Sequence, residues 1–277
     1  MFRVTRLVVT VILVAGCGSG SAPPDGGVSR DTADALGGTV TTATATTATT
    51  QTATPTLPEF SPDRRTPERE KMVAQQIEGR GVRDKAVLLA MRRVPRHLFV
   101  PPDMQSMAYD DRPLPIGMGQ TISQPYIVAY MTEQLGLKPD DRVLEVGTGS
   151  GYQAAVAAEI VREVCTVEII PELGRPAAER LAAMGYTNIL TRTSDGYNGW
   201  KEHAPYDAII VTAAASHVPP PLLQQLRPGG RIVIPVGSTP WTQDLVLVRK
   251  APDGRATTQI LIGVAFVPLT RAVGGAD

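Results

Sequence analysis

The 277-residue chain is poor in cysteine, because only Cys17 and Cys165 are present. Two cysteines cannot supply the set of bridges that stabilises small secreted domains, nor a zinc site built from cysteine ligands. The three histidines, His97, His203 and His217, are scattered and lack the spacing typical of metal ligands. We therefore expect a fold held together by an ordinary hydrophobic core, with no metal.

The chain also lacks an excess of charge of either sign. Its 27 acidic residues balance its 27 Lys and Arg residues. Proteins that bind nucleic acid usually carry a strong basic surplus or a basic patch. The composition therefore gives no support for a nucleic-acid partner.

The N-terminus has the features of an export signal. Arg3 and Arg6 precede an apolar stretch at residues 7–15, which is too short to span a bilayer as a mature helix. The stretch ends in Leu-Val-Ala-Gly-Cys, which resembles a bacterial lipobox with Cys17 as the lipidated residue. We predict a lipoprotein-type signal peptide at residues 1–17 and possible membrane anchoring through Cys17. A spurious leader from a misassigned start codon is the alternative.

Residues 18–65 show no pattern that would form a core. Within them, residues 35–58 carry no charge and consist mainly of Thr and Ala. Such a segment cannot bury enough apolar surface to offset the entropy lost on ordering. We predict a disordered tether at residues 18–65 and a folded domain at residues 66–277.

The segment at residues 142–151, Arg-Val-Leu-Glu-Val-Gly-Thr-Gly-Ser-Gly, organises that domain. It begins as a short apolar run typical of a buried parallel strand and continues into Gly147, Gly149 and Gly151. An alanine-rich segment at residues 152–164 is predicted to be a helix. A strand, a glycine turn and a helix form the first unit of a nucleotide-binding α/β sheet.

The glycine spacing distinguishes between two cofactors. A dinucleotide fingerprint reads G-x-G-x-x-G and places a pyrophosphate at the helix N-terminus. Here the spacing is G-x-G-x-G, and Glu145 precedes the first glycine by two residues. A carboxylate would repel a pyrophosphate, whereas S-adenosylmethionine carries a sulfonium and an ammonium group. We therefore predict S-adenosyl-L-methionine rather than NAD, with a plain connecting turn as the alternative.

Helical and strand patterns alternate along the rest of the chain. An N-terminal extension is predicted to contain helices at 67–77, with Thr66 as N-cap, and at 85–93, with Asp84 as N-cap. Ala86, Leu89, Ala90 and Val94 are the expected buried face of the second helix. An extended segment at 94–102 and a turn-rich, functional loop at 114–125 follow, and then a helix at 125–135. Later strands are predicted at 164–168, 188–192, 208–212, 231–236, 245–249 and 258–264, with helices at 172–184 and 220–226.

This order predicts an α/β fold of the Rossmann-like, class I S-adenosylmethionine-dependent methyltransferase type. The sheet should be mostly parallel, with helices on both faces and an antiparallel edge made by the last two strands. Ligands of such sheets lie beyond the carboxyl ends of the strands. Glu168 ends the second strand and can accept both ribose hydroxyls, whereas Asp195 can reach the adenine amino group. Gly196 would allow close approach, although a solvent-facing acid and an Asp-Gly turn are the alternatives.

From about residue 67 to residue 270 the chain resembles the protein-L-isoaspartate (D-aspartate) O-methyltransferase family. The most specific motif is Gly-x-Gly-Gln-Thr-Ile-Ser-Gln-Pro at residues 117–125. Other matching segments are Val-Pro-Arg-His-x-Phe-Val-Pro at 94–101, Leu-Glu-Val-Gly-Thr-Gly-Ser-Gly-Tyr-Gln at 144–153 and Pro-Tyr-Asp-Ala-Ile-Ile-Val-Thr-Ala-Ala at 205–214. Ser194 stands where the family usually has glycine.

The resemblance implies transfer of a methyl group from S-adenosyl-L-methionine to the free α-carboxylate of L-isoaspartyl residues in damaged proteins. By the same resemblance Ser123 is the active-site serine, and Gln120 and Thr121 shape the substrate pocket. We expect the Ser123 hydroxyl to orient the carboxylate, since no G-x-S-x-G nucleophile elbow is present. A turn serine that bonds its own backbone is the alternative.

Three rival functions and two locations stay open at this point. The rivals are an NAD-dependent oxidoreductase, another class I methyltransferase, and a non-catalytic, lipid-anchored binding module with a methyltransferase-like fold. The family and the supply of cofactor predict a cytoplasmic protein, whereas the leader predicts an exported protein anchored through Cys17. We expect a monomer in either case.

Overall fold

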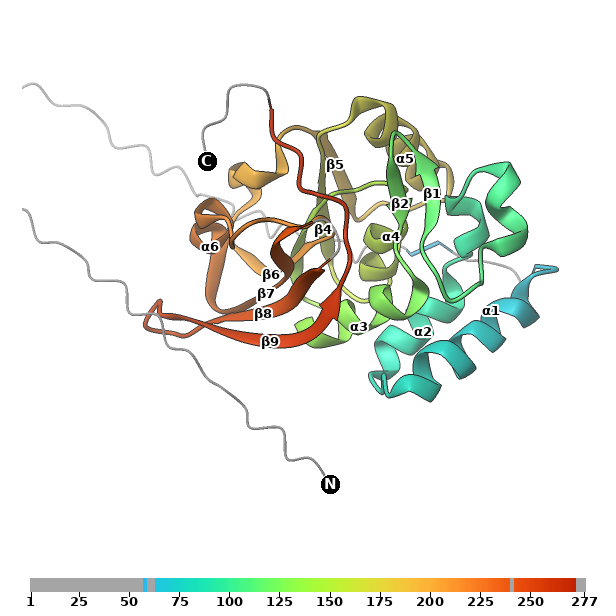
Figure 1. Ribbon diagram of the computed structural model, residues 1–277, viewed down its shortest axis with the longest axis horizontal. Helices are drawn as coiled ribbons and strands as arrows, with labels where there is room; N and C mark the ends of the chain where they lie inside the picture. Colours follow the sequence, from blue (N-terminus) through green and yellow to red (C-terminus); the bar gives the residue numbers. More distant parts are fainter. Residues whose placement is uncertain (1–56, 59–62, 240–241, 273–277) are drawn as a thin grey trace, which may run out of the picture. The chain divides into compact units, whose positions relative to one another are not determined.

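The computed structural model describes residues 57–58, 63–239 and 242–272 (Figure 1). The predicted signal peptide, Cys17 and most of the predicted tether therefore lie outside the described residues. Two parts of the predicted tether do contact the folded domain. The buried Pro58 accepts a hydrogen bond from Arg93 Nη2 at 3.0 Å, and Asp63 pairs with Arg69 at 3.3 Å. Contacts with the domain thus begin before residue 66.

A seven-stranded sheet in the order β5-β4-β3-β6-β7-β8-β9 forms the centre of the domain. Strands β3 to β7 are parallel, and β8 and β9 add an antiparallel edge. The bounds are β3 Arg142–Val146, β4 Glu163–Glu168, β5 Ile189–Thr193, β6 Tyr206–Val211, β7 Leu226–Thr239, β8 Thr242–Lys250 and β9 Ala256–Val264. The predicted parallel sheet with its antiparallel edge is confirmed, and its order reverses between β3 and β6.

Both faces of the sheet are covered. Successive residues of β3 face opposite sides, so Val143 belongs to one core and Leu144 to the other. The first core includes residues of α3 (Pro125–Leu135) and α4 (Tyr152–Ala158), and the second includes Leu222 of α6 (Pro220–Gln225). Helix α5 spans Pro171–Ala183 and contacts β4 and β5. None of the helices in the described ranges is long and apolar enough to cross a membrane.

Helix α4 is shorter than the alanine-rich segment predicts. It ends at Ala158, and Ile160 and Val161 leave the helix to pack in the core. The side chain of Asn188 donates to the carbonyl oxygens of Ala158 and Val161 at 2.9 and 3.1 Å. These bonds satisfy acceptors that the end of a helix leaves free. Because Asn188 lies 30 residues from Ala158, local sequence gives no sign of this stop.

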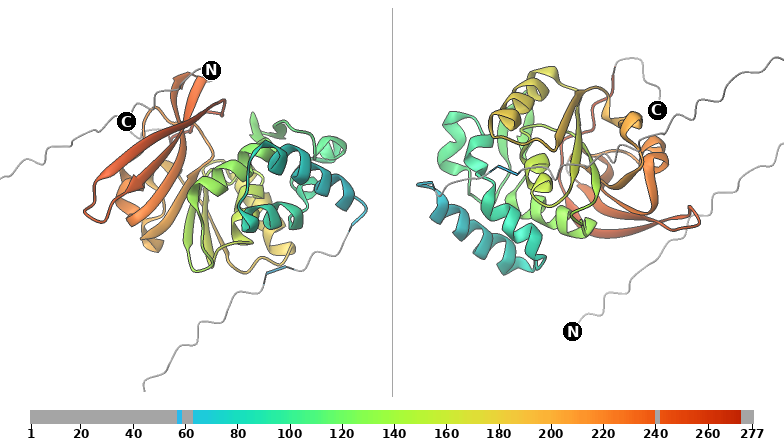
Figure 2. Two further views of the ribbon diagram at one scale, coloured as in Figure 1. Left: turned by 90° about the horizontal axis from the view of Figure 1, so that it is seen from below. Right: turned by 180° about the vertical axis from the view of Figure 1, so that it is seen from behind.

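The predicted N-terminal helices are present, beside α3 and α4 (Figures 1 and 2). Helix α1 (Thr66–Met72) continues as a π-helical turn at Val73–Ile77, and α2 spans Lys85–Arg93. Asp84 caps α2 as predicted, since its carboxylate accepts from two backbone N–H groups. Thr66 is not the cap of α1, because the N-cap position is Arg65.

The predicted buried face of α2 is wrong in part. Ala86 and Leu89 are exposed, whereas Ala90 and Val94 are buried as expected. Val87, Leu88 and Met91, which the prediction omitted, complete the buried side. Helix α2 contacts α1, α3 and α4, so neighbouring helices rather than the periodicity of α2 alone determine which residues are covered.

Two segments predicted to be irregular are folded. Arg96–Phe99 forms a 3-10 turn where an extended segment was expected, and a second 3-10 helix spans Pro102–Met107. Within the expected loop, β1 (Leu114–Gly117) and β2 (Gln120–Ile122) form a separate antiparallel hairpin. Its turn places Met118 at φ 51°, an unusual conformation for a non-glycine residue. The hairpin delivers Ser123 directly after β2.

The buried face of α2 that the structure shows predicts that replacing two neighbouring leucines by alanine has different effects on the free energy of unfolding. Leu88→Ala should lower the free energy of unfolding by about 2–5 kcal/mol, because Leu88 is buried. Leu89→Ala should change it by less than about 0.5 kcal/mol, because that side chain is 56% exposed. Urea unfolding of both variants measures the difference. Equal losses would contradict the described packing of α2.

Candidate active site

The glycine loop follows β3 as predicted. Gly147, Gly149 and Gly151 all have positive φ, and Gly151 occupies the N-cap position of α4. A Cβ atom on Gly147 would lie 2.4 Å from Thr212 Oγ1, closer than real Cβ contacts allow. Glycine is therefore required at position 147 both for conformation and for space.

Glu168 ends β4 beside this loop. The side chain is buried, with Oε2 accepting from Gly149 N at 2.8 Å and Oε1 from Ile170 N at 3.0 Å. Each carboxylate oxygen can accept a second hydrogen bond, so both keep capacity for ribose hydroxyls. Glu168, Gly147, Gly149 and Gly196 line one cavity of about 60 Å³. The structure thus brings four of the predicted cofactor residues together, whereas Gly151 and Asp195 do not line this cavity. The Glu168 carboxylate fits the ribose of the predicted cofactor.

Asp195 is engaged in contacts that the sequence did not indicate. Its Oδ1 accepts from Tyr197 N at 3.0 Å, and its Oδ2 accepts from Arg271 Nε at 3.0 Å and from Ala272 N at 3.3 Å. The Arg271 guanidinium carbon also lies 3.6 Å from the centroid of the Tyr197 ring. The predicted contact with the adenine amino group stays a prediction, and it would share the carboxylate with Arg271.

Gly196 has a packing role beside β3. A Cβ atom at this position would lie 2.5 Å from Val146 Cγ1, the last residue of β3. Only glycine lets the segment after β5 approach this closely. That approach brings the segment to the wall of the same cavity.

The expected charge of Glu145 is not supported. Its side chain is fully buried and accepts a hydrogen bond from Thr166 Oγ1 at 2.5 Å. Burial raises the pKa of Glu145 to about 8, so the carboxyl group is mostly protonated at neutral pH. Burial therefore weakens the argument that this carboxylate repels a pyrophosphate and attracts a cation.

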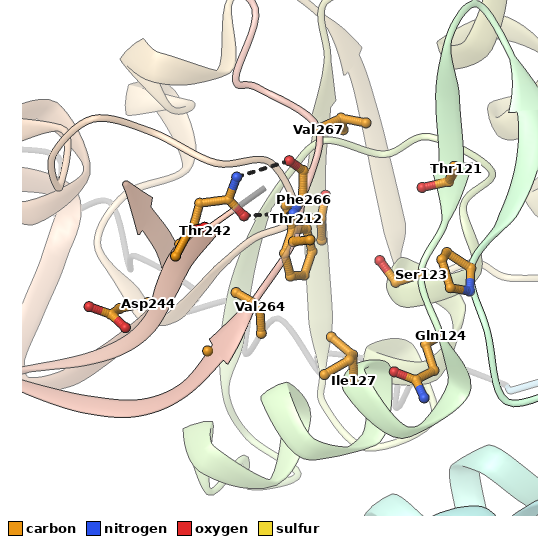
Figure 3. A pocket seen from close by; sticks show the side chains of 14 residues that line it. Thr121, Ser123, Gln124, Ile127, Thr212, Thr242, Asp244, Val264, Phe266 and Val267 are labelled. Carbon is orange, nitrogen blue, oxygen red and sulfur yellow. Dashed lines mark hydrogen bonds between the residues drawn. The ribbon is translucent and has the colours of Figure 1, made fainter. Parts of the chain in front are cut away.

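Ser123 lies between β2 and α3, at a cavity of about 530 Å³. Among the described residues its hydroxyl has no hydrogen-bond partner, which argues against a turn serine that bonds its own backbone. Figure 3 shows Thr121, Ser123 and Gln124 on one side of the cavity, opposite Asp244 and Phe266.

Three cavities meet beside the glycine loop. Thr121 and Thr212 line the 530 Å³ cavity, the 60 Å³ cavity and a third of about 40 Å³. Ser123 lines the first and third, and Gln120 the second. The predicted substrate residues and four of the predicted cofactor residues, Gly147, Gly149, Glu168 and Gly196, therefore line adjoining cavities.

Thr212 ends the fourth predicted strand, at the sheet edge where the sequence predicts ligand contacts, and in the structure it directly follows β6. Its hydroxyl donates to Gly147 O at 2.6 Å, and its backbone N–H donates to Val146 O at 2.9 Å. Thr212 thus ties the end of β6 to the beginning of the glycine loop.

One group of metal-ligand atoms is present where sequence spacing gave no sign of it. Ligand atoms of Glu163, Cys165 and His203 lie within 4.8 Å of one another. However, Arg142 pairs with Glu163, and burial raises the pKa of the Cys165 thiol to about 12. A thiol must lose its proton to bind a metal, so the neighbouring cation and the raised pKa both disfavour one.

The comparisons with known proteins decide the family. The model of the protein-L-isoaspartate(D-aspartate) O-methyltransferase family matches residues 67–274. The chain belongs to this family. It is 60% identical over 203 residues to protein-L-isoaspartate O-methyltransferase 1 of Nitrosospira multiformis, covering 73% of this chain and 86% of that protein. It is 58% identical over 207 residues to protein-L-isoaspartate O-methyltransferase of Opitutus terrae, covering 75% of this chain and 88% of that protein.

Solved structures agree with these relatives. A structure titled protein-L-isoaspartate O-methyltransferase superposes with a TM-score of 0.66 at 31% identity, covering 72% of this chain and 65% of that one. A putative family member from Plasmodium falciparum in complex with S-adenosyl-L-homocysteine has a TM-score of 0.63 at 25% identity, covering 74% and 99%. The predicted family, fold, methyltransferase class and cofactor are confirmed, and the NAD-dependent alternative is set aside.

A glycine pair separates the need for space from the need for a positive φ. Gly147 and Gly81 have φ values of 98° and 101°, but a Cβ atom on Gly81 would contact nothing within 4 Å. Both alanine variants should lose about 1–2 kcal/mol of stability through backbone strain. Only Gly147→Ala should also weaken binding of S-adenosylhomocysteine more than tenfold in calorimetry. Equal affinities of the two variants would contradict the described fit at Thr212.

The raised pKa of Glu145 predicts that the protein loses stability as pH rises. The carboxyl group of Glu145 ionises near pH 4.5 when unfolded but near pH 8 when folded, so between these values the folded state binds more protons. The free energy of unfolding should therefore fall as pH rises through this window. Denaturant unfolding should show this fall relative to Glu145→Gln, which cannot ionise. Parallel pH profiles of the two proteins would show that Glu145 is already charged.

Proposed function

We propose that this chain repairs damaged proteins by methylating the free α-carboxylate of L-isoaspartyl residues. Gly147, Gly149, Glu168 and the segment around Gly196 would hold S-adenosyl-L-methionine. The observation that carries the proposal is the position of the Ser123 hydroxyl. Ser123 lines both the cavity of about 530 Å³ and the cavity of about 40 Å³ beside the glycine loop, and its hydroxyl has no hydrogen-bond partner among the described residues.

The chemistry needs positioning more than acid–base groups. The bound cofactor supplies an electrophilic methyl group on a positively charged sulfur. The substrate carboxylate is already ionised at neutral pH, so no general base is required. The residues of the site therefore lower the barrier by aligning a carboxylate oxygen with the methyl group and by removing its water.

Ser123 is suited to orienting rather than attacking. A nucleophilic serine needs a base within hydrogen-bond reach, and no described His or acidic side chain bonds its hydroxyl. The free O–H can instead donate to one oxygen of the substrate carboxylate and leave the other oxygen to react. The methyl ester formed in this way then closes to a succinimide without further help from the enzyme.

The large cavity suits a peptide as the carrier of that carboxylate. Its volume of about 530 Å³ falls within the range of ~300–1,000 Å³ typical of ligand sites. Gln124 and Ile127 line one side, and residues 263–267 line the other. Thr121 shapes the wall shared with the cofactor cavity, and Gln120 lies on the cofactor side.

The cellular location of the protein depends on N-terminal residues that the structure does not describe. We propose a cytoplasmic monomer as the active form, because the cofactor is made in the cytosol. The competing proposal is a signal peptide at residues 1–17, a tether at 18–65 and export with anchoring through Cys17. Mass spectrometry of the native N-terminus tests these proposals, since a diacylglyceryl-cysteine means export and an unprocessed start means cytoplasm. Sedimentation of the purified chain tests the monomer.

Replacing Ser123 tests the proposed function. Ser123→Ala should bind S-adenosylhomocysteine with unchanged affinity, because the glycine loop and Glu168 are intact. Its kcat/KM for an isoaspartyl peptide should fall about 10²-fold, the scale of effect expected for losing a group that positions a reactant. Ser106→Ala is the matched control, because Ser106 is exposed on the 3-10 helix at Pro102–Met107.

Two outcomes would oppose the proposal. Full turnover by Ser123→Ala with unchanged peptide KM would remove the role of Ser123. Failure of the unmodified chain to bind S-adenosylhomocysteine would instead favour a non-catalytic module with a methyltransferase-like fold.

A further inference from the structure

Arg96 is a buried cation close to the candidate site. The side chain is fully buried, and no carboxylate of the described residues contacts it. Burial lowers the pKa of Arg96 to about 10, so the guanidinium is still charged at neutral pH. Burying a charge without an ion partner is costly unless its donors are well satisfied. A charged side chain that is buried at this cost in free energy is expected to have a structural or functional role.

Two of the three guanidinium nitrogens of Arg96 donate to backbone carbonyls, whereas Nη1 has no hydrogen-bond partner among the described residues. Nε donates to Ala108 O at 2.8 Å, and Nη2 donates to Ser123 O at 2.7 Å. Hydrogen bonds from a charged donor are stronger and more directional than those between neutral groups. Two such bonds from one rigid guanidinium fix the separation of the segments that carry the two carbonyls.

The third contact of Arg96 is with the beginning of α4. Its guanidinium carbon lies 4.9 Å from the centroid of the Tyr152 ring, a distance suited to a cation–π interaction. Tyr152 is the first residue of α4 and directly follows Gly151 of the glycine loop. Arg96 therefore contacts both the segment that carries Ser123 and the segment that carries the glycine loop.

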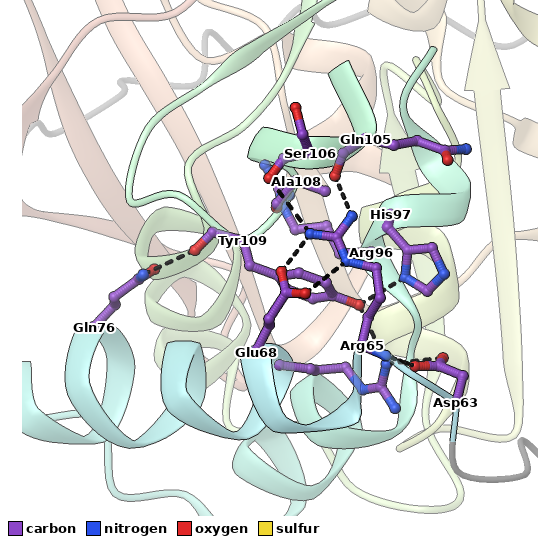
Figure 4. Close-up of polar contacts among 11 residues, drawn as sticks. Asp63, Arg65, Glu68, Gln76, Arg96, His97, Gln105, Ser106, Ala108 and Tyr109 are labelled. Atoms are coloured by element: carbon purple, nitrogen blue, oxygen red, sulfur yellow. Dashed lines mark hydrogen bonds and ion pairs between the residues drawn. The ribbon is translucent and has the colours of Figure 1, made fainter. Parts of the chain in front are cut away.

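The Ala108 end of this arrangement is itself held in place (Figure 4). The hydroxyl of the neighbouring Tyr109 accepts from Arg69 Nη1 at 3.2 Å and lies 2.8 Å from His97 Nδ1. The carbonyl oxygen of Tyr109 accepts from Gln76 Nε2 at 2.8 Å. The N-terminal extension thus provides a fixed support from which Arg96 reaches the active site.

We propose that Arg96 is a positioning residue for methyl transfer, which holds the Ser123 hydroxyl at a set place relative to the glycine loop. This proposal rests on the proposed role of Ser123. Arg96 lines none of the three cavities described above, so it would act through the backbone of Ser123 and the ring of Tyr152. A shift of about 1 Å in a positioning group can cost on the order of 10²-fold in rate.

Two conservative replacements separate positioning from simple core filling. Arg96→Lys keeps the charge, but its single ammonium group cannot reproduce the geometry of the two hydrogen bonds to Ala108 O and Ser123 O. Arg96→Gln keeps a donor for one carbonyl and removes the buried charge, which favours folding. For both variants we expect kcat on an isoaspartyl peptide to fall about 10- to 100-fold. The Kd of S-adenosylhomocysteine should stay within threefold of that of the unmodified chain.

Arg231→Lys is the control for a general loss of stability. Arg231 also donates to a backbone carbonyl, that of Leu135 at the end of α3, at 2.9 Å. It does not line any of the three cavities described above. This variant should lower the melting temperature and leave kcat unchanged.

A double-mutant cycle with Ser123→Ala gives the decisive readout. If Arg96 acts through Ser123, adding Arg96→Lys to Ser123→Ala should lower kcat by less than threefold further, because interacting sites are not additive. Independent effects, in which the two losses multiply, would overturn the proposal. So would an Arg96→Lys enzyme with kcat within twofold of the unmodified chain, or one that loses cofactor affinity in parallel with kcat. Activity of the unmodified chain on the same peptide tests the proposed function separately.

Discussion

The close approach of β3 and β6 at their carboxyl ends is the constraint on which the site depends. Thr212 donates from its backbone to Val146 and from its hydroxyl to Gly147, so the two strand ends are joined at the switch point of the sheet. No side chain fits at Gly147 because Thr212 Oγ1 occupies that space. Bare backbone is thereby presented to the cavity, and Glu168 completes its wall.

The sequence predicts those parts of the fold that depend on neighbouring residues. Asp84 caps α2 through N–H groups two and three residues away, and the glycines after β3 set the turn within five residues. Contacts between distant segments are invisible to such patterns. The end of α4 depends on Asn188, which lies 30 residues beyond Ala158. The buried face of α2 likewise depends on the helices packed around it.

Only some features of the candidate site could likewise be predicted from the sequence. Its residues could be found from strand ends and motifs, but their charge states and partners could not. The carboxyl group of Glu145 belongs to a fully buried residue, and only the fold reveals that it keeps its proton near neutral pH. Asp195 is 76 residues from Arg271, which pairs with it, so neither residue predicts the other.

The central claim is that a methyl donor held at the glycine loop meets a free α-carboxylate at Ser123. Transfer of labelled methyl from S-adenosyl-L-methionine to a matched pair of peptides tests this claim most directly. The peptides carry L-isoaspartate or normal aspartate at one position and are otherwise identical. The account predicts label in the isoaspartyl peptide and almost none in the aspartyl peptide, with the label lost again as the ester closes. An unlabelled isoaspartyl peptide, or equal labelling of both peptides, would contradict it.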